Sequence, residues 1–541
     1  MTGPDPEWWR GAVIYQVYPR SFQDSDGDGI GDLKGVTARL DHIASLGVDA
    51  IWVSPFFRSP MADMGYDVSD YRDVDPIFGT LADFDALLEK AHALGMKVII
   101  DQVLSHSSDQ HAWFRESRRD RTNPKADCYV WADPKPDGTA PNNWLSIFGG
   151  PAWEWDGTRM QYYMHSFLAS QPDFNFHNPE VRDALLDIMR FWLDRGVDGF
   201  RLDACNHYFH DAALRDNPPA PRAAGHDVPD TNPYGFQEHL YDKTQPENLP
   251  FLQQIRALLD EYPGSVAVGE VGDGDRSPAT VGLYTGRGDK LHFCYTFDLF
   301  GSDFSPAMFR TTVEKFDEAT RDGWVCWALS NHDVPRHATR FARKGDDPAR
   351  IARMALAILI ALRGAICLYQ GEELALPEAE IAFDDLRDPY GIRFWPAFKG
   401  RDGCRTPMPW TDGEHGGFSI EKPWLPVSSE HRARAVSVQE SDRRSVLHFY
   451  REALAFRRSS RALQSGDLEF VEASVDFLAF TRRHERQELL CLYNFSREPR
   501  DWPLLPEFVT AFVERCSAPG ITTNRKTIRM PALGWAFLRR L

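Results

Sequence analysis

Short apolar runs alternate with amphipathic segments along the first two thirds of the chain. The apolar runs are nearly continuous and rich in Val and Ile, which is typical of strands in a parallel sheet covered on both faces. The segments between them carry apolar residues at helical spacing. Eight strands are predicted: Val13–Tyr18, Val48–Val53, Lys97–Val103, Gly199–Leu202, Val266–Val271, Leu291–Phe297, Trp324–Leu329 and Ala365–Tyr369.

Eight strand–helix units in this order predict an α/β fold, the (β/α)8 or TIM barrel, whose active site lies at the carboxyl ends of the strands. We expect the barrel to comprise residues 1–106 and 174–464. Residues 107–173 are rich in Trp, Tyr, Gly and Pro, and we interpret them as a lobe that is inserted after the third strand and covers the barrel mouth. Two more irregular segments, Asn217–Glu247 and Glu373–Glu440, follow the fourth and eighth strands.

After a predicted closing helix, Ser441–Arg458, the apolar residues recur with a period of two. This pattern is typical of antiparallel strands with one buried face. The strands are predicted at Val475–Phe480, Leu489–Phe495 and Trp535–Leu538, so we expect a separate antiparallel β-domain over residues 465–541.

Composition narrows the classes of function. The net charge of −18 argues against nucleic acid or an anionic membrane as a partner. The eight cysteines are scattered and form no C-x-x-C pair, which favours buried free thiols in a reducing compartment. The N-terminal residues lack the pattern of a signal peptide, and no apolar run is long enough to span a membrane. We therefore expect a soluble, cytoplasmic protein, either a monomer or a homodimer.

An acidic loop follows the first strand and has the ligand spacing of a calcium loop. Glycine stands at its sixth position, and glycine replaces the glutamate expected at the twelfth. Four carboxylates in nine residues repel one another unless a cation neutralises them, although a solvated acidic turn is the alternative. The sequence predicts a structural Ca²⁺ or Mg²⁺ held by Asp24, Asp26, Asp28, the Ile30 carbonyl and Asp32, with no organic cofactor.

Polar residues gather where the predicted strands end. Arg201 and Asp203 are two residues apart on one strand, so their side chains share a face and the guanidinium can keep the carboxylate ionised. Other strands end in further carboxylates and histidines, and such a ring would be costly to bury without a purpose. The full set is Asp101, His106, Arg201, Asp203, Glu270, His332 and Asp333. The set predicts a catalytic site.

These residues lie within motifs by which the chain resembles glycoside hydrolase family 13, the α-amylase family, and within it the α-glucosidases that cleave oligosaccharides. The likeness extends from Trp8 to the C-terminus. The motifs are Asp101-Gln-Val-Leu-Ser-His106, Gly199-Phe-Arg-Leu-Asp203, Gly269-Glu270, Asn331-His-Asp333, Gln171-Pro-Asp-Phe-Asn175, Gly65-Tyr-Asp-Val-Ser-Asp-Tyr71 and Arg405-Thr-Pro-Met408.

The resemblance implies a role for each residue. Asp203 would be the nucleophile, Glu270 the general acid and base, and Asp333 a ligand of the sugar hydroxyls that favours the distorted transition state. Double displacement retains the anomeric configuration and requires the two reacting carboxyl groups to lie roughly 5–5.5 Å apart. The implied substrate-binding residues are Asp63, Tyr66, His106, Phe148, Phe167, Arg201, Phe297, His332 and Arg401. Asp101 would brace Arg201.

Two positions refine the resemblance. Ser105 stands where the family commonly has an Asn that belongs to a metal site, which argues against a second cation there. Ala204, directly after the implied nucleophile, is similar to the members selective for α-1,4 linkages, whereas members selective for α-1,6 linkages often carry Val. A difference of this size in a pocket decides only a modest preference.

The resemblance implies a retaining, exo-acting α-glucosidase that acts on short α-glucosides such as maltose or sucrose and can transfer glucose to hydroxyl acceptors. Four alternatives remain. The first is an enzyme that predominantly transfers glucose to sugars, alcohols or phenols, and the second is an isomerising sucrose enzyme. The third is an endo-acting amylase, which the long lobe and the motif at Gln171 disfavour. The fourth is a non-catalytic relative, which the retained carboxylates and the lack of a membrane span disfavour.

Overall fold

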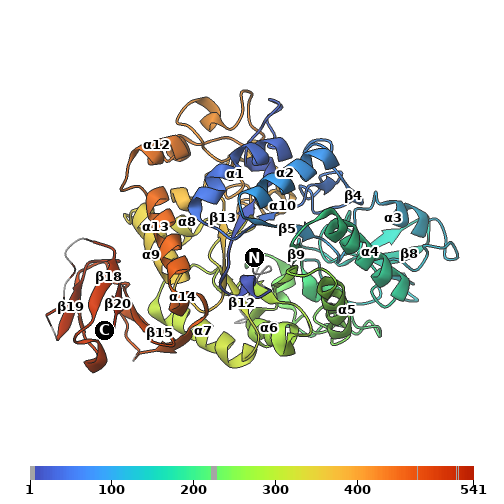
Figure 1. The fold of residues 1–541 in the computed structure, drawn as a ribbon. Helices are drawn as coiled ribbons and strands as arrows, with labels where there is room; N and C mark the ends of the chain where they lie inside the picture. The colour runs from blue at the N-terminus through green and yellow to red at the C-terminus, as the bar shows by residue number, and fades with distance from the viewer. Residues whose placement is uncertain are drawn as a thin grey trace.

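The computed structural model describes residues 6–220, 228–471, 473–518, 521, 523–524 and 526–540. Eight parallel strands close into a barrel in the order β1-β13-β12-β11-β10-β9-β5-β2 (Figure 1). They are β1 (Val13–Val17), β2 (Ala50–Val53), β5 (Lys97–Gln102), β9 (Gly199–Leu202), β10 (Val266–Val271), β11 (Phe293–Thr296), β12 (Val325–Ala328) and β13 (Ala365–Tyr369). The predicted barrel and its eight strands are confirmed.

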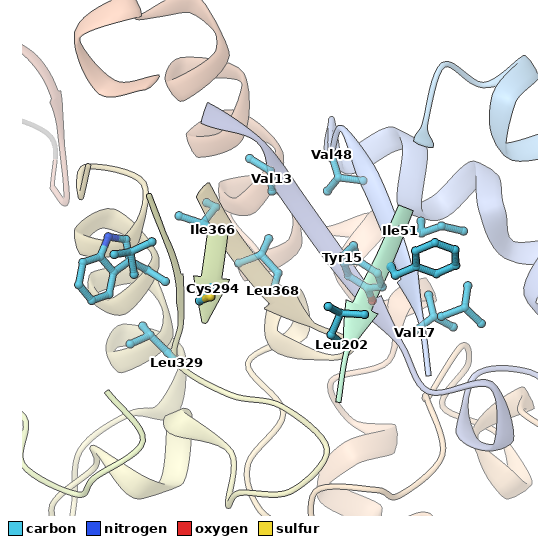
Figure 2. Packing of buried hydrophobic residues seen from close by; sticks show 14 of the residues in the cluster. Val13, Tyr15, Val17, Val48, Ile51, Leu202, Cys294, Leu329, Ile366 and Leu368 are labelled. Carbon is cyan, nitrogen blue, oxygen red and sulfur yellow. The ribbon is translucent and has the colours of Figure 1, made fainter. Parts of the chain in front are cut away.

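Successive side chains of each barrel strand point alternately into the barrel and out toward the helices, so they form two apolar layers. The strands' inward side chains, such as Ile14, Trp52 and Val268, form one cluster inside the barrel. The outward side chains pack under the helices in a larger cluster, part of which Figure 2 shows. Tyr15 and Leu202 are among its members. Each strand is therefore buried on both faces, as the near-continuous apolar runs predict.

The helices begin and end at local signals in the sequence. Asp32 caps α1, Thr80 forms a capping box with Asp83 at the start of α2, and Asn178 caps α4. Left-handed Gly47 ends α1. The helices of the barrel region are α1 (Leu33–Leu46), α2 (Leu81–Ala93), α4 (Pro179–Arg195), α5 (Asn248–Asp260), α6 (Ser277–Thr285), α7 (Pro306–Thr320), α8 (His337–Arg340), α9 (Pro348–Leu359), α10 (Pro389–Phe394), α11 (Ser429–Arg432) and α12 (Val436–Ser441).

The segment after β5 folds as a small lobe on its own apolar core. It contains α3 (Ala112–Ser117) and a three-stranded sheet of β6 (Trp131–Ala132), β7 (Trp153–Asp156) and β8 (Gln161–Met164). Leu214 and Tyr241, from the long segment after β9, pack against this core. The lobe and that segment therefore support each other beside the barrel mouth; residues 221–227 of the segment lie outside the described residues.

The C-terminal region is an antiparallel sheet, as predicted, with strand order β14-β15-β16-β20-β18. Figure 1 shows it at the side of the barrel away from the lobe. The strands are β14 (Asp467–Phe470), β15 (Phe477–His484), β16 (Gln487–Asn494), β18 (Phe512–Cys516) and β20 (Trp535–Arg539), and β17 (Arg500–Pro503) pairs with β19 (Thr527–Met530). Two further short strands, β3 (Phe57–Arg58) and β4 (Asp70–Val74), pair beside the barrel.

The predicted helix Ser441–Arg458 starts too early. Ser441 ends α12, and α13 (Val446–Ser459) begins after a break, with Ser445 as its cap. Helix α14 (Arg461–Ser465) follows. Arg457 is fully enclosed and donates from Nη1 to the Ile360 carbonyl (2.6 Å) and from Nη2 to the Gly364 carbonyl (2.6 Å). The closing helix is thus anchored by a charge-assisted contact to carbonyls before β13.

Within the described ranges, no helix has the length and apolar character needed to cross a bilayer. The eight cysteines all fall within these ranges and are free thiols, seven of them buried. The prediction that the N-terminal residues carry no signal peptide rests on Met1–Glu7, and most of these residues lie outside the part of the chain that the structure describes.

Asp173, in the stretch that follows the lobe sheet, makes stability depend on pH. Burial raises the pKa of its carboxyl group to about 7, although the Ser166 hydroxyl donates to it at 2.6 Å. The carboxyl of an unfolded chain titrates near pH ~3.9. The folded protein therefore holds this proton more tightly, so the resulting stability is present below about pH 4 and lost as pH rises through about 7.

We expect Asp173→Asn to become more stable relative to the wild type as pH rises from 4 to 7, by up to about 3–4 kcal/mol. The uncharged amide avoids the burial of a carboxylate and can still hydrogen-bond to Ser166. Urea unfolding at several pH values measures the difference. Glu154→Gln, an exposed change on β7, is the control and should follow the wild-type profile. A pH-independent difference for Asp173→Asn would contradict the assignment.

Candidate active site

Four polar side chains meet inside the barrel. They stand at paired positions on neighbouring strands, and side-chain alternation turns all four inward. Asp101 on β5 is paired with Arg201 on β9, and Glu270 on β10 is paired with Tyr295 on β11. In each strand these residues share the inward face with the apolar residues below them. The sequence prediction that the strand ends bring these polar groups together agrees with this arrangement.

Arg201 is the centre of the group and is completely buried. Its Nη1 donates to Asp101 Oδ1 (2.8 Å) and to Asp203 Oδ1 (2.5 Å). Its Nη2 lies 2.5 Å from Glu270 Oε1 and donates to the Tyr295 hydroxyl (3.0 Å). One planar guanidinium thus fixes three carboxyl groups at once.

The sequence predicts that Arg201 keeps the Asp203 carboxyl group ionised, but in the structure Asp203 shares this guanidinium with two other carboxyl groups. Burial raises the pKa of the Asp203 carboxyl well above its usual value; Arg201 opposes the shift, and Glu270 and Asp101 add to it. Burial likewise raises the pKa of Asp101 to about 6 against the pull of Arg201. Arg201 does not belong to Asp203 alone, so one positive charge is spread over three carboxyl groups.

The backbone directly after Asp203 has an unusual conformation. Ala204 has φ 40°, in the left-handed region, and its N–H donates to Glu270 Oε2 (2.8 Å). A non-glycine residue there costs of order 1 kcal/mol or more, which the surrounding bonds offset. Gly199, at the start of β9, approaches the Val266 carbonyl so closely that a Cβ atom would lie 2.2 Å from its oxygen.

Asp333 lies among cationic and aromatic partners. Arg405 Nη2 donates to its Oδ1 (2.8 Å), Arg401 Nη1 donates to the same atom (3.3 Å), and His332 Nε2 lies 3.1 Å from Oδ2. Burial would raise the pKa of Asp333, but His332, Arg405 and Arg401 outweigh it and hold the pKa well below its usual range. Asp333 is therefore ionised at every pH at which the protein would be used.

A second ionic cluster contributes Asp63 and Arg401 to the wall of the pocket. Arg401 Nη2 donates both to Asp63 Oδ1 (2.7 Å) and to Asp388 Oδ1 (2.7 Å). Gln171 Nε2 donates to the other oxygen of Asp63 (3.1 Å). The ring of Phe148 lies under the Arg401 guanidinium, 4.9 Å from its centre. Asp63 and Arg401 thus pair as the resemblance implies.

Most of the predicted residues line one cavity with a volume of about 970 Å³, whereas Arg201 and His332 are fully buried and are not among its lining residues. Tyr66 stacks on His332 with ring centres 5.2 Å apart, and its hydroxyl lies 2.6 Å from His332 Nε2. His106 packs against Phe167, and burial lowers its pKa to about 4, so it is neutral near pH 7. The predicted residues on the cavity wall are Asp63, Tyr66, His106, Phe148, Phe167, Asp203, Glu270, Phe297, Asp333 and Arg401.

The prediction omitted several residues that the structure brings to the site. Asp388 and Arg405 hold Arg401 and Asp333, and Tyr295 bridges Arg201 and Glu270 with a 2.7 Å bond to Glu270. Only Arg405 stood in a recognised motif. His207 follows Asp203 by four residues, lines the cavity, and has a buried Nδ1 without a hydrogen-bond partner among the described residues.

The acidic loop brings three carboxylates together. Ligand atoms of Asp24, Asp26 and Asp28 lie within 4.8 Å of one another. Burial and the neighbouring carboxylates raise the pKa of Asp28. Asp32 lies outside this group of three and instead caps α1 and accepts hydrogen bonds from Ser25. The donor set, carboxylate oxygens with a nearby Ile30 carbonyl in the loop, suits a hard cation.

Fold and site together define a class of protein: a barrel enzyme that cleaves glycosides with paired carboxyl groups. A model of the alpha-amylase catalytic domain matches residues 16–466. The chain therefore belongs to the α-amylase family and is a glycoside hydrolase.

Individual relatives agree with this assignment. The chain is similar to a probable alpha-glucosidase of Rhizobium meliloti (strain 1021), with 60% identity over 92% of this chain and 91% of the relative. An oligo-1,6-glucosidase of Heyndrickxia coagulans is 37% identical over 92% of this chain and 95% of its own length. Among solved structures, the alpha-glucosyl transfer enzyme XgtA is 56% identical, with a TM-score of 0.95 over 99% of both chains.

We expect Asp388→Asn to raise KM for maltose about tenfold, equivalent to about 1.4 kcal/mol, with a smaller effect on kcat. Asp388 accepts hydrogen bonds from the Arg401 guanidinium, and Asn can still cap α10 because its one oxygen can accept from the Tyr390 N–H. Steady-state kinetics measure the split between KM and kcat. The control is Asp384→Asn, an exposed carboxylate nearby. A wild-type KM for Asp388→Asn would contradict the positioning role.

Proposed function

We propose that this enzyme is a retaining, exo-acting α-glucosidase of short α-glucosides. The observation that supports this most directly is the bridge made by Arg201, which brings Asp203 and Glu270 to two nitrogens of one guanidinium. Retaining glycosidases need two carboxyl groups that lie close together, whereas inverting enzymes leave room between them for water.

In the first displacement, Glu270 carries the proton and Asp203 reacts as the carboxylate that Arg201 stabilises. Asp203 attacks C1 of the non-reducing glucose from its β face. Glu270 donates a proton to the glycosidic oxygen, the C1–O bond breaks, and the aglycone leaves as an alcohol. Asp203 and C1 are then joined in a β-glucosyl ester. Positive charge develops on the sugar ring in the transition state, and the ionised Asp333 on the cavity wall stabilises it.

In the second displacement, Glu270 acts as a base. It removes a proton from water as the water oxygen attacks C1 from the α face, and the ester bond to Asp203 breaks. The product is α-glucose, and both carboxyl groups return to their initial state. An acceptor alcohol in place of water gives an α-glucoside by the same route.

The closed end of the cavity supports exo action. Arg401 forms ion pairs with Asp63, Asp388 and Asp333. A substrate that continued beyond the first glucose in this direction would have to break these ion pairs, so the glucose bound here is the end of its chain. These side chains offer charged hydrogen-bonding groups to terminal hydroxyls. Short substrates that expose a non-reducing glucose, such as maltose or sucrose, fit this geometry.

The aglycone side of the cavity favours transglucosylation as a second activity. Phe297, Phe300, Tyr234 and the imidazole of His207 line the cavity, and we assign them to the acceptor side. Aromatic walls pack against an organic acceptor and reduce the advantage of water. Ala204 supports a preference for α-1,4 linkages because it leaves room beside the nucleophile, although one methyl-sized difference decides only a modest preference.

The decisive experiment follows the anomer of glucose released from maltose by NMR. We expect α-glucose first, with β-glucose appearing only as the sugar mutarotates. Addition of glycerol or a phenol should divert part of the glucose into transfer products. Initial β-glucose would contradict double displacement, and dominant transfer at low acceptor concentration would make the enzyme chiefly a transferase. On sucrose, an isomeric disaccharide as main product would reveal an isomerase.

Azide distinguishes the two carboxyl groups chemically. Asp203→Gly should lose turnover by about 10⁴-fold or more, and azide should restore cleavage of an activated α-glucoside to give β-glucosyl azide. Glu270→Ala should instead give α-glucosyl azide, because the Asp203 ester still forms and azide attacks its opposite face. Asp384→Asn serves as the control. The reverse pattern of anomers would exchange the two roles.

We further propose that the acidic loop holds a structural Ca²⁺ or Mg²⁺. The support is the approach of three carboxylates and the bonds that tie the loop to a distant segment: Asp24 N–H donates to the Phe418 carbonyl (3.1 Å), and Trp424 N–H donates to the Gly29 carbonyl (3.0 Å). A cation would relieve carboxylate repulsion and secure this junction.

Removal of the cation with EDTA should lower Tm by several degrees, while kcat at saturating maltose changes little. Bound metal is measured by elemental analysis before and after treatment. Asp26→Asn should reproduce the lower Tm and lose the response to EDTA. A protein with no bound metal, or an immediate loss of turnover without loss of folding, would contradict a structural cation.

A further inference from the structure

A second hollow lies beside the active-site cavity and shares no lining residue with it. Its volume is about 350 Å³. Its walls combine apolar side chains, Met61, Met64 and Trp424, with the cationic side chains of Arg20, Arg387 and Lys422. The roles derived above for the active site and for the acidic loop involve none of these side chains.

Arg20 is a buried guanidinium without a carboxylate partner. Its exposed fraction is only 6%. It stacks on Trp424 at 5.2 Å and on Phe78 at 5.6 Å, and Nη2 contacts Met61 Sδ at 3.1 Å. Its Nε has no hydrogen-bond partner, and no described carboxylate forms an ion pair with this side chain. Burial lowers the pKa of Arg20, and the more distant charges of Asp75 and Asp28 oppose this shift only in part.

A buried charge of this kind is expensive unless an opposite charge comes close. The buried arginines of the active site, Arg201, Arg401 and Arg405, each form ion pairs with carboxylates, and the enclosed Arg457 donates to backbone carbonyls. Arg20 therefore differs from its neighbours in the one respect that an anion would correct.

The other two cations reinforce this charge. Arg387 and Lys422 are exposed at the hollow, and neither side chain forms an ion pair within the described residues. Asp385 is the one carboxylate on the wall, so the lining carries a net charge of +2. A positive hollow stands out on a protein whose net charge is −18.

We propose that this hollow binds a small oxyanion of the phosphate or sulfate class, held by Arg20, Arg387 and Lys422. Arginine matches the geometry of such oxygens, and lysine adds a point charge. The apolar walls of Met61, Met64 and Trp424 leave space beside the charge, so the anion is either a free ion or the phosphate of a small ester such as a sugar phosphate. The inference does not depend on the proposed hydrolytic mechanism.

The position of the hollow connects it to the active site. Met61 and Met64 have positive φ angles (65° and 53°) and flank Asp63, while Arg387 directly precedes Asp388. Asp63 and Asp388 are the two carboxylates that hold Arg401. An oxyanion would thus bridge the two segments that form the closed end of the sugar pocket.

Isothermal titration of the full-length protein with inorganic phosphate tests the proposal, in buffers of constant ionic strength and with chloride as the reference anion. Saturating glucose occupies the active site, so that the cations there do not contribute. We expect one site per chain with a Kd of about 1 mM or tighter. Sulfate should compete with phosphate. Glucose 1-phosphate then distinguishes the sources: tighter binding than phosphate indicates an ester, and equal or weaker binding indicates the free ion.

Variants assign the binding to this hollow. Arg387→Gln/Lys422→Gln should raise the Kd for phosphate by about tenfold or more. Its matched control is Lys344→Gln/Arg350→Gln, which removes two exposed charges elsewhere and should leave the Kd unchanged. Arg20→Gln should abolish binding, and without phosphate it should be at least as stable as the wild type because it removes an uncompensated buried charge.

Phosphate and sulfate also stabilise proteins without binding, by exclusion from their surface. A rise in Tm that is the same in the wild type and in all variants is therefore evidence against the site. The proposal is overturned by an absence of saturable binding in the titration, by equal Kd values for the double variant and its control, or by binding of maltose but not of phosphate in the hollow.

Discussion

The active site depends on one buried guanidinium. Arg201 contacts Asp101, Asp203 and Glu270, and these three carboxyl groups come from three neighbouring strands. Without that positive charge the three would repel one another inside the barrel, and none could be held at a fixed distance from the others. Arg201 is itself held by the face of Trp52, 4.8 Å away, so its plane and therefore the positions of the carboxyl groups are set by the barrel interior.

The barrel allows this arrangement because successive side chains of a strand point alternately to its inner and its outer face. Phe200 and Leu202 belong to the outer cluster that packs under the helices, and Arg201 between them faces inward. A slip of one residue in β9 would send Arg201 into the apolar layer and bring two large apolar groups to the site. Gly199 prevents such a slip in part, since only glycine fits against the Val266 carbonyl. The requirement for packing and the requirement for catalysis thus fix the same register.

This agreement explains what the sequence could predict. Each of the eight strands is a continuous apolar run, and the polar residue at its end is part of the same local pattern, so Asp203 and Glu270 can be recognised without knowledge of distant contacts. The partners Asp63 and Arg401 were implied only by resemblance, because 338 positions separate them along the chain. Asp388 and Tyr295 carried no local signal, and their roles come from contacts that only the folded chain creates. The break between α12 and α13 was missed for a related reason, since Ser441 and Ser445 are both plausible caps.

The charges of the assembled site suit the chemistry that takes place there. Around the first sugar lie the carboxyl groups of Asp63, Asp101, Asp203, Glu270, Asp333 and Asp388, against the guanidinium groups of Arg201, Arg401 and Arg405. The carboxyl groups therefore outnumber the cations, even when Glu270 is counted as protonated, as the proposed mechanism requires. A neutral glucoside gains little from this excess of negative charge, whereas the transition state, with its positive ring, gains much. Because the groups are held by ion pairs before the substrate arrives, they need little reorganisation as that charge develops. The excess of carboxyl groups is costly to bury in the folded protein, and the same excess stabilises the positive charge of the transition state.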